Sequence, residues 1–183
     1  VLRCCCKGLL ALRVSWLECK DSVDVDASNL SACSWLWKNV PSIKALSLSS
    51  ATETQLQGLL QDAKALAALT LHNCSISTMP NLPGQLEQLR VFNCLSEKEA
   101  AAYPESLSVA YFCRCNSLEK LPSLPMALLE LSFVNCRVLA EIPDLPDALK
   151  YLECTDCPSL KQLPELPSGL TSLYLERCER LQV

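Results

Sequence analysis

The stretch that decides the fold reads LEKLPSLPMALLELSFVNCRV (118–138), LAEIPDLPDALKYLECTDCPS (139–159) and LKQLPELPSGLTSLYLERCER (160–180). The three segments align without a gap, and each carries the pattern Leu-x-x-Leu-x-(Leu/Phe/Cys)-x-x-Cys. Cysteines recur every 21 residues from Cys115 to Cys178. A fixed period of this length is typical of a solenoid, in which one structural unit stacks on the next. The sequence therefore predicts a chain of stacked coils.

Alternating residues in each segment predict a short strand with one buried and one free face. In Leu149-x-x-Leu152-x-Cys154, side chains 152 and 154 share one face, and side chains 151, 153 and 155 share the other. Stacked strands about 4.7–4.9 Å apart form a parallel sheet over a continuous core. The two prolines of Leu-Pro-x-Leu-Pro, as at 163–167, exclude a helix between strands. We therefore expect an α/β solenoid, a curved horseshoe with the sheet on its concave face and mostly extended, Pro-rich convex arcs.

The same pattern predicts one domain, 1–183, with seven regular repeats over 43–183. The repeats start at Ile43, Leu66, Leu86, Leu107, Leu128, Leu149 and Leu170. Two arcs near the start of this series lack the Leu-Pro pair. Residues 58–69 contain good helix formers and predict a helix. Ser96 with Glu99 forms a capping-box pattern that predicts a helical turn.

Residues 1–42 are predicted to be an irregular repeat or cap. Leu9-x-x-Leu12-x-Val14-x-x-Leu17 fits one more repeat strand, and the apolar stripe from Leu30 to Trp37 fits a short helix. We expect the tryptophans to fill the end of the core, with a partner-binding tryptophan cluster as the alternative; these are Trp16, Trp35 and Trp37. The chain lacks an initiating Met and starts within the pattern, so we expect it to be a fragment of a longer protein.

Composition argues against two classes of partner. The 183 residues carry a formal net charge of −4 with interspersed signs, without the basic patch that nucleic acids and anionic membranes attract. Charged residues interrupt the most apolar stretch, near the N-terminus, before it reaches the roughly 18 residues of a membrane-spanning helix. We therefore predict no nucleic-acid binding, no membrane span and, as a fragment, a monomer.

The chain has thirteen cysteines, and most of those in the regular part follow the repeat. Six occupy the turn-closing position of successive repeats: Cys74, Cys94, Cys115, Cys136, Cys157 and Cys178. We interpret these as reduced thiols that behave as small buried hydrophobes and donate weakly to backbone carbonyls. Disulfides between neighbouring coils are the alternative, because their α-carbons lie within bridging range.

The cysteine spacings raise the question of a zinc site. Cys154 and Cys157 have zinc-ligand spacing, but repeat register explains both positions better. The triplet Cys4, Cys5 and Cys6 has no such explanation, and its role stays open. We predict no metal and no cofactor.

The repeats resemble those of the leucine-rich-repeat superfamily over residues 66–183. The unit Met79-Pro80-Asn81-Leu82-Pro83 is similar to repeats of secreted bacterial LPX-type effectors, including those fused to a ubiquitin-ligase domain. The segment Cys157-Pro158-Ser159-Leu160 is similar to the C-terminal repeats of plant TIR-type NLR immune receptors. The chain has neither a nucleotide-binding loop nor a TIR segment. The resemblance therefore implies only the recognition part of either family.

The outward columns of the predicted sheet indicate where a protein partner would bind. Aromatic and arginine side chains offer large contact area or forked hydrogen bonding and dominate many interfaces. We predict these partner-binding residues: Phe92, Tyr111, Arg114, Tyr151, Glu153, Tyr174 and Arg177.

We predict no catalytic residues. His72, the single histidine, is expected on the free face, while the neighbouring Cys74 points elsewhere, so a Cys/His nucleophile pair is disfavoured. The expected function is recognition of a protein in the cytoplasm, or in the host cytosol for an effector. The alternatives are the substrate-recognition part of a ubiquitin-ligase effector whose catalytic domain is absent here, and a structural scaffold.

Overall fold

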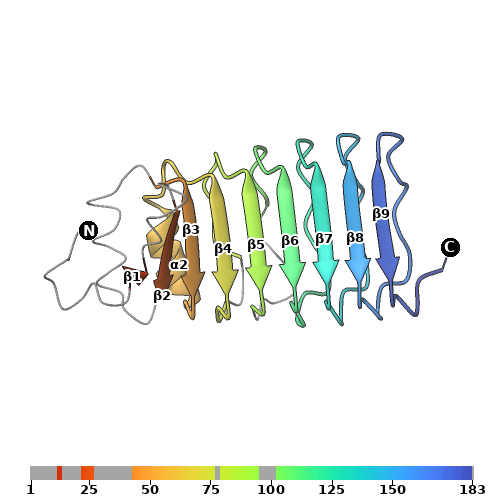
Figure 1. Ribbon diagram of the computed structural model, residues 1–183, viewed down its shortest axis with the longest axis horizontal. Helices are drawn as coiled ribbons and strands as arrows, with labels where there is room; N and C mark the ends of the chain where they lie inside the picture. The colour runs from red at the N-terminus through yellow and green to blue at the C-terminus, as the bar shows by residue number, and fades with distance from the viewer. Residues whose placement is uncertain (1–11, 14–21, 27–42, 77–78, 95–101, 183) are drawn as a thin grey trace, which may run out of the picture.

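The structure is a computed structural model that describes residues 12–13, 22–26, 43–76, 79–94 and 102–182. Its strands form a single row in chain order (Figure 1). Their bounds are β1 Leu12–Arg13, β2 Ser22–Asp26, β3 Ala45–Ser49, β4 Ala68–His72, β5 Gln88–Phe92, β6 Val109–Cys113, β7 Glu130–Val134, β8 Tyr151–Thr155 and β9 Ser172–Glu176. The predicted parallel solenoid of leucine-rich-repeat type is confirmed.

The strands from β2 to β9 pair in parallel and in strict register. Leu131, for example, lies opposite Leu152, and Leu152 lies opposite Leu173. In-register stacking places equivalent leucines of successive coils in one column, so a single core runs along the solenoid. The inward leucines of β3 to β8 are buried, with at most 2% of their surface exposed.

The N-terminal strand assignment from the sequence is wrong in position. Leu12–Arg13 does not start a parallel repeat: it pairs antiparallel with β2. The parallel strand that precedes the regular series is β2, which lies after the predicted repeat strand at Leu9–Leu17. Ser22 lies opposite Ala45, and Ala45 lies opposite Ala68, so both steps are 23 residues long. The spacing of β2 from β3 therefore equals the first spacing of the regular series.

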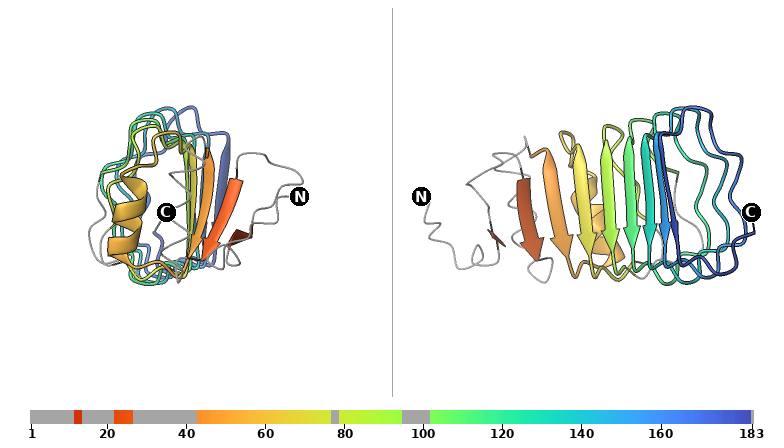
Figure 2. Two further views of the ribbon diagram at one scale, coloured as in Figure 1. Left: turned by 90° about the vertical axis from the view of Figure 1, so that its left-hand side faces the viewer. Right: turned by 45° about the vertical axis from the view of Figure 1, so that its right-hand side comes forward.

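The arcs cover one face of the sheet and leave the other face free. In the end-on view (Figure 2, left) the helix α2 (Glu53–Leu60) and the arcs lie on one side of the strands. The first and last strands lie farther toward the free side than the middle ones. The free face is therefore concave, as the sequence predicts.

The convex arcs are helical only at α2, Glu53–Leu60, among the described residues. The helix predicted over 58–69 is wrong in its bounds, because β4 begins at Ala68 and turns occupy the residues after Gln61. The backbone N–H of Thr52 donates to Gln55 Oε1 at 2.7 Å, and this contact fixes the earlier start. The predicted turn at Ser96, the predicted helix at 30–37 and the three tryptophans lie outside the described residues.

The Pro-rich arcs are extended, as predicted. Each ends in a tight turn in which a leucine N–H donates to the carbonyl of the second proline, as Leu149 does to Pro146 at 3.0 Å. The first residue of each Pro-rich arc packs against the core; these residues are Met79, Leu121, Ile142 and, partly buried, Leu163. The proline pair thus sets both the extended path and the turn into the next strand.

A residue in the left-handed backbone conformation directly follows each strand from β3 to β9, and the sequence analysis did not predict it. Positive φ values of 50–58° recur at Ser50, Asn73, Asn93, Arg114, Asn135, Asp156 and Arg177. The N–H of each of these except Arg177 donates to the carbonyl of the last residue of the next strand; for Asn135 and Thr155 the distance is 2.8 Å. Asn, Asp and Ser recur here because short polar side chains tolerate this conformation best.

Candidate functional site

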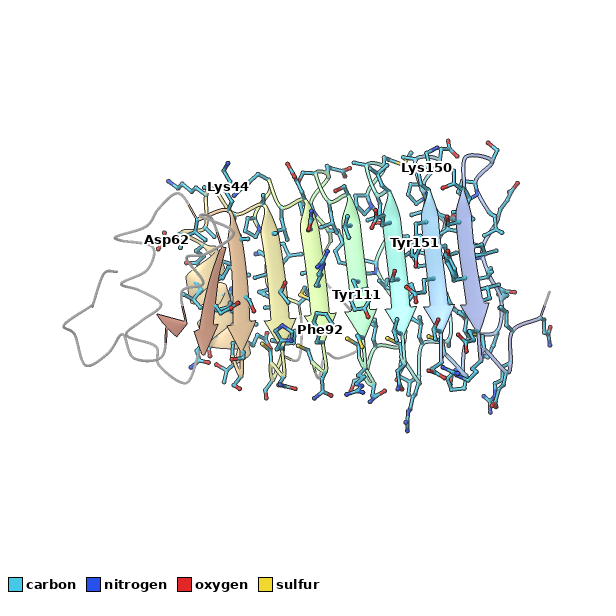
Figure 3. The ribbon with its side chains drawn as sticks, viewed as in Figure 1. Lys44, Asp62, Phe92, Tyr111, Lys150 and Tyr151 are labelled. Carbon is cyan, nitrogen blue, oxygen red and sulfur yellow. The ribbon has the colours of Figure 1, made fainter. Side chains whose placement is uncertain are left out.

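The sheet register confirms that the predicted outward residues share the free face in columns. One column runs through Thr70, Arg90, Tyr111, Ser132, Glu153 and Tyr174, and its neighbour runs through His72, Phe92, Cys113, Val134, Thr155 and Glu176. Figure 3 shows Phe92, Tyr111 and Tyr151 spread along this face. Side chains from strands about 20 residues apart in sequence therefore meet there.

The first group on the free face, the N-terminal aromatic cluster, consists of His72, Phe92 and Tyr111. The imidazole of His72 stacks on Phe92 with ring centroids 4.7 Å apart and an interplanar angle of 15°. Phe92 in turn contacts Tyr111 at 5.3 Å with tilted rings. The sequence predicts His72 on this face, but His72 is not among the predicted binding residues. His72 occupies the same repeat position as Phe92, one repeat earlier, and this match could have identified it as a binding residue.

The second group, the C-terminal aromatic cluster, consists of Tyr151, Glu153 and Tyr174. The tyrosine rings lie 5.4 Å apart. The hydroxyl of Tyr151 donates to Glu153 Oε2 at 3.1 Å. Burial and the hydrogen-bonded Glu153 carboxylate raise the pKa of Tyr151, so its hydroxyl stays protonated and holds the carboxylate in place. Tyr174 remains 56% exposed. The sequence placed all three residues on one face, and the structure brings them into contact.

β7 separates the two clusters with a small side chain. Ser132 lies between Tyr111 and Glu153 in its column and is only 6% exposed. The pKa of Tyr111 is raised to about 12, mainly by burial and to a smaller extent by the nearby Cys113 and Glu153. Tyr111 is therefore a neutral hydrogen-bond donor at physiological pH. The free face thus presents two aromatic ridges on either side of a serine.

The two predicted arginines differ in their surroundings, although both occupy the left-handed position after a strand. Arg177 forms a two-point contact with Asp156, through Nε to Oδ1 and through Nη2 to Oδ2 at 2.9 Å, and it also pairs with Glu176 at 2.8 Å. Arg114 makes no ion pair with any residue that the structure describes. The sequence does not distinguish them, because the acid that binds Arg177 is 21 residues away in the chain.

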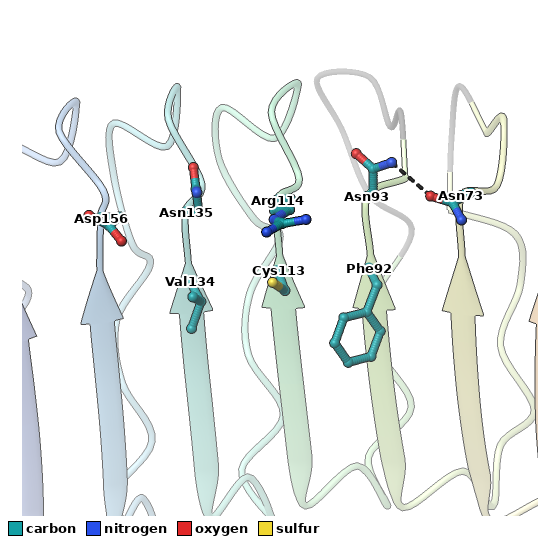
Figure 4. A pocket seen from close by; sticks show the side chains of 8 residues that line it. All are labelled: Asn73, Phe92, Asn93, Cys113, Arg114, Val134, Asn135 and Asp156. Atoms are coloured by element: carbon teal, nitrogen blue, oxygen red, sulfur yellow. Dashed lines mark hydrogen bonds between the residues drawn. The ribbon is translucent and has the colours of Figure 1, made fainter.

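A pocket of about 520 Å³ opens where β5, β6 and β7 end (Figure 4). We call it the edge pocket. It is lined by Asn73, Phe92, Asn93, Cys113, Arg114, Val134, Asn135 and Asp156. Of these residues the sequence singled out only Phe92 and Arg114 for binding. Most of the other lining residues are an Asn or Asp directly before a repeat cysteine, and this recurrence in the sequence could have identified them.

The cysteine column is structural. The six turn-closing cysteines are free, and those of the interior repeats are buried. Cys136 Sγ lies 3.6 Å from the carbonyl of Phe112 and 3.8 Å from that of Val134, and Cys157 repeats the pattern with Phe133 and Thr155. These contacts fit the predicted role as buried thiols that donate to carbonyls.

The described residues give no support to metal binding or to a nucleophile pair. No three potential metal ligands gather within the described ranges. Cys74 Sγ contacts the backbone carbonyl of His72 at 3.5 Å and is buried, while the His72 ring stacks on Phe92 on the free face. Cys4, Cys5 and Cys6 lie outside the described residues. In the same described part, no helix has the length and apolar character that a membrane span requires.

The chain was also compared with known proteins and solved structures. No protein-family model matches the chain, and no curated protein matches it. The chain is similar to YopM from Yersinia enterocolitica WA-314, with a TM-score of 0.32 and 21% sequence identity. The matched region covers 72% of this chain and 44% of that one, so the chain spans less than half the length of that protein.

Proposed function

We propose that this chain is a non-catalytic recognition module that binds a protein partner through the free face of its sheet. The observation that supports this most directly is the pair of aromatic clusters on an uncovered sheet, with Tyr174 more than half exposed. The resemblance of the repeats extends the proposal to an immune-type receptor or a secreted bacterial effector. The substrate-recognition half of a ubiquitin ligase is a special case of the same binding role.

The physical basis is the low cost of fixing these side chains. Phe92 and Tyr111 already rest on each other, as do Tyr151 and Tyr174, so binding would restrict little additional rotamer freedom. Tyrosine rings offer apolar area with a hydroxyl that satisfies a buried polar group of the partner. Rigid aromatic anchors of this kind commonly provide most of an interface's binding energy.

The test is affinity capture with the parent chain and a variant that carries Tyr111→Ala, Tyr151→Ala and Tyr174→Ala. Captured proteins are quantified by mass spectrometry. We expect one or more specific partners to be lost with the variant, because truncating a central aromatic residue typically costs about 2 kcal/mol or more of binding free energy.

The matched control removes exposed apolar side chains elsewhere in the molecule, through Met126→Ala, Val138→Ala and Leu166→Ala. These side chains are 37–65% exposed and lie outside the strands. Partners should be retained by this control. Equal retention by both variants would contradict binding through the free face and would favour the scaffold alternative.

We further propose that the module works in a reducing compartment such as the cytoplasm. Free thiols at every cysteine in the described part of the chain support this proposal. Mass spectrometry of the protein, isolated from its native source with rapid alkylation, tests it. Disulfide-linked peptides between repeat cysteines would contradict it.

A further inference from the structure

The edge pocket has an apolar floor and a polar wall. Phe92, Cys113 and Val134 are the last residues of β5, β6 and β7 and point to the free face (Figure 4). The next residue after each of these three, which has a left-handed backbone conformation, contributes to the wall: Asn93, Arg114 and Asn135. The pocket therefore offers an apolar surface directly beside hydrogen-bonding groups.

Hydrogen bonds with each other and with Arg137 occupy part of the hydrogen-bonding capacity of the wall residues and leave the positive charge of Arg114 at the centre of the wall. Asn93 Nδ2 donates to Asn73 Oδ1 at 2.7 Å, and Asn135 Oδ1 accepts from Arg137 Nε at 3.2 Å. An amide whose oxygen is engaged still has an NH₂ group with two donors. Asn135 thus presents donors beside the guanidinium of Arg114.

Arg114 stands out against the equivalent position of the last repeat. Both arginines have a backbone conformation that favours Asn, with φ values of 56° for Arg114 and 51° for Arg177. Arg177 has an internal partner in Asp156, and its positive charge also neutralises that wall carboxylate. Arg114 has no such partner among the described residues. A forked guanidinium at the centre of a pocket matches a carboxylate.

We propose that the edge pocket binds the C-terminal end of a peptide or protein chain whose last residue is apolar. The carboxylate would pair with Arg114 and the Asn135 amide, and the last side chain would lie on Val134, Cys113 and Phe92. Each wall residue directly follows a floor residue in the chain, so their α-carbons are about 3.8 Å apart. A carboxylate and a side chain attached to one α-carbon fit this short separation. This inference rests on the proposed protein-binding function and specifies one feature of the partner.

The volume fits a few terminal residues. Pockets of roughly 300–1,000 Å³ commonly enclose small organic ligands, and the edge pocket lies within this range. Upstream residues of the bound chain would continue across the free face toward Tyr111, because the pocket floor belongs to that face.

The experiment uses synthetic hexapeptide pools with randomised upstream positions, incubated with the immobilised 183-residue chain and quantified by mass spectrometry. Pool one ends in Leu or Phe with a free carboxylate. Pool two has the same sequences as C-terminal amides. Pool three is also amidated and carries Asp next to the last residue. We expect pool one to be enriched about tenfold over pool two, the value of one charge-assisted contact.

Arg114→Asn is the variant of choice, because Asn occupies the same left-handed position at Asn73, Asn93 and Asn135. It should fold as the parent does and lose the preference for free carboxylates. Val134→Thr should weaken the preference for an apolar last residue. The matched control is Arg180→Asn, which removes the same charge from an exposed residue outside the pocket and should bind as the parent.

Three results would overturn the inference: equal enrichment of pools one and two, enrichment of pool three above pool one, or unchanged binding by Arg114→Asn. The second result would assign the pocket to an acidic side chain. If Arg114→Asn still captures the protein partner that the triple tyrosine variant loses, the proposed function stands without the carboxylate site. If neither variant loses a captured protein, the proposed function fails together with it.

Discussion

The repeats at β8 and β9 have nearly the same sequence pattern but different environments. Leu152 and Leu173 lie opposite each other in register, yet Leu152 is fully buried and Leu173 is 40% exposed. The next inward pair behaves the same way, since Cys154 is buried and Leu175 is 38% exposed.

The difference shows that burial in this protein comes from the neighbouring coil. A repeat specifies its own strand, turn and arc, but its leucines lose contact with water only when coils lie on both sides. Within the described residues β8 has such neighbours on both sides, and β9 has one. Equivalent substitutions in the two repeats therefore separate local effects from stacking effects.

The largest expected effect is on the free energy of unfolding. Leu152→Ala should lower it by about 2–5 kcal/mol, because the substitution leaves a cavity between packed coils. Leu173→Ala should lower it by only about 1 kcal/mol, since part of that side chain already contacts water and no closed cavity forms. Urea unfolding followed by circular dichroism measures both values.

Equal losses at the two positions would contradict this comparison. They would mean that β9 is covered in solution, by another copy or by a further segment. Analytical ultracentrifugation of the parent at several concentrations would then distinguish self-association from intramolecular covering.

An intermediate effect is expected from pH, through the cysteine column. Hydrogen bonding with Cys115 and burial raise the pKa of Cys136 from 9.0 to about 12. The unfolded chain therefore releases this proton at lower pH than the folded chain. The corresponding stability is complete below pH 9 and is lost as pH rises toward 12, by at most about 1.4 kcal/mol per pH unit. Urea unfolding across this range should show the loss, and Cys136→Ala should reduce it.

Thiol labelling compares the accessibility of a buried cysteine of this column with that of partly exposed cysteines. Cys178, at the less covered end, and Cys113, on the free face, are partly exposed, whereas Cys136 is buried. Maleimide should modify Cys178 and Cys113 in the folded protein and reach Cys136 only after denaturation. Rapid labelling of Cys136 under native conditions would show that the interior repeats open locally.

The smallest effect is expected at the surface contact between Arg177 and Asp156. Hydrogen bonding with Arg177 lowers the pKa of Asp156, so this contact favours the folded state at neutral pH and is lost as pH falls through the lowered value. Both groups are exposed, and such pairs contribute little to stability. Arg177→Gln should raise the pKa of Asp156 in an NMR titration and leave urea unfolding unchanged. A loss as large as that of Leu173→Ala would contradict this assignment.

The repeat period predicted the fold well because each side-chain column depends on local spacing. The free-face columns through Tyr111 and Tyr174 follow directly from strands of constant register. Local helix propensity gave a wrong prediction at 58–69, because Ala68 pairs with Ala45 and Gln88 and is therefore part of a strand. The repeat pattern at Leu9–Leu17 also gave a wrong prediction, because Leu12–Arg13 pairs antiparallel with β2 and does not form a parallel repeat strand.

The sequence by itself determined the period, the inward leucines, the extended Pro-rich arcs and the residues that share the free face. These features depend on spacing within one repeat, which can be read along the chain. Only the tertiary structure decided that His72 stacks on Phe92, that Arg177 is bound to Asp156 while Arg114 lines a pocket, and that Leu173 is less buried than Leu152. Those features depend on contacts between different coils, whose side chains are about 20 residues apart in sequence and meet only after stacking.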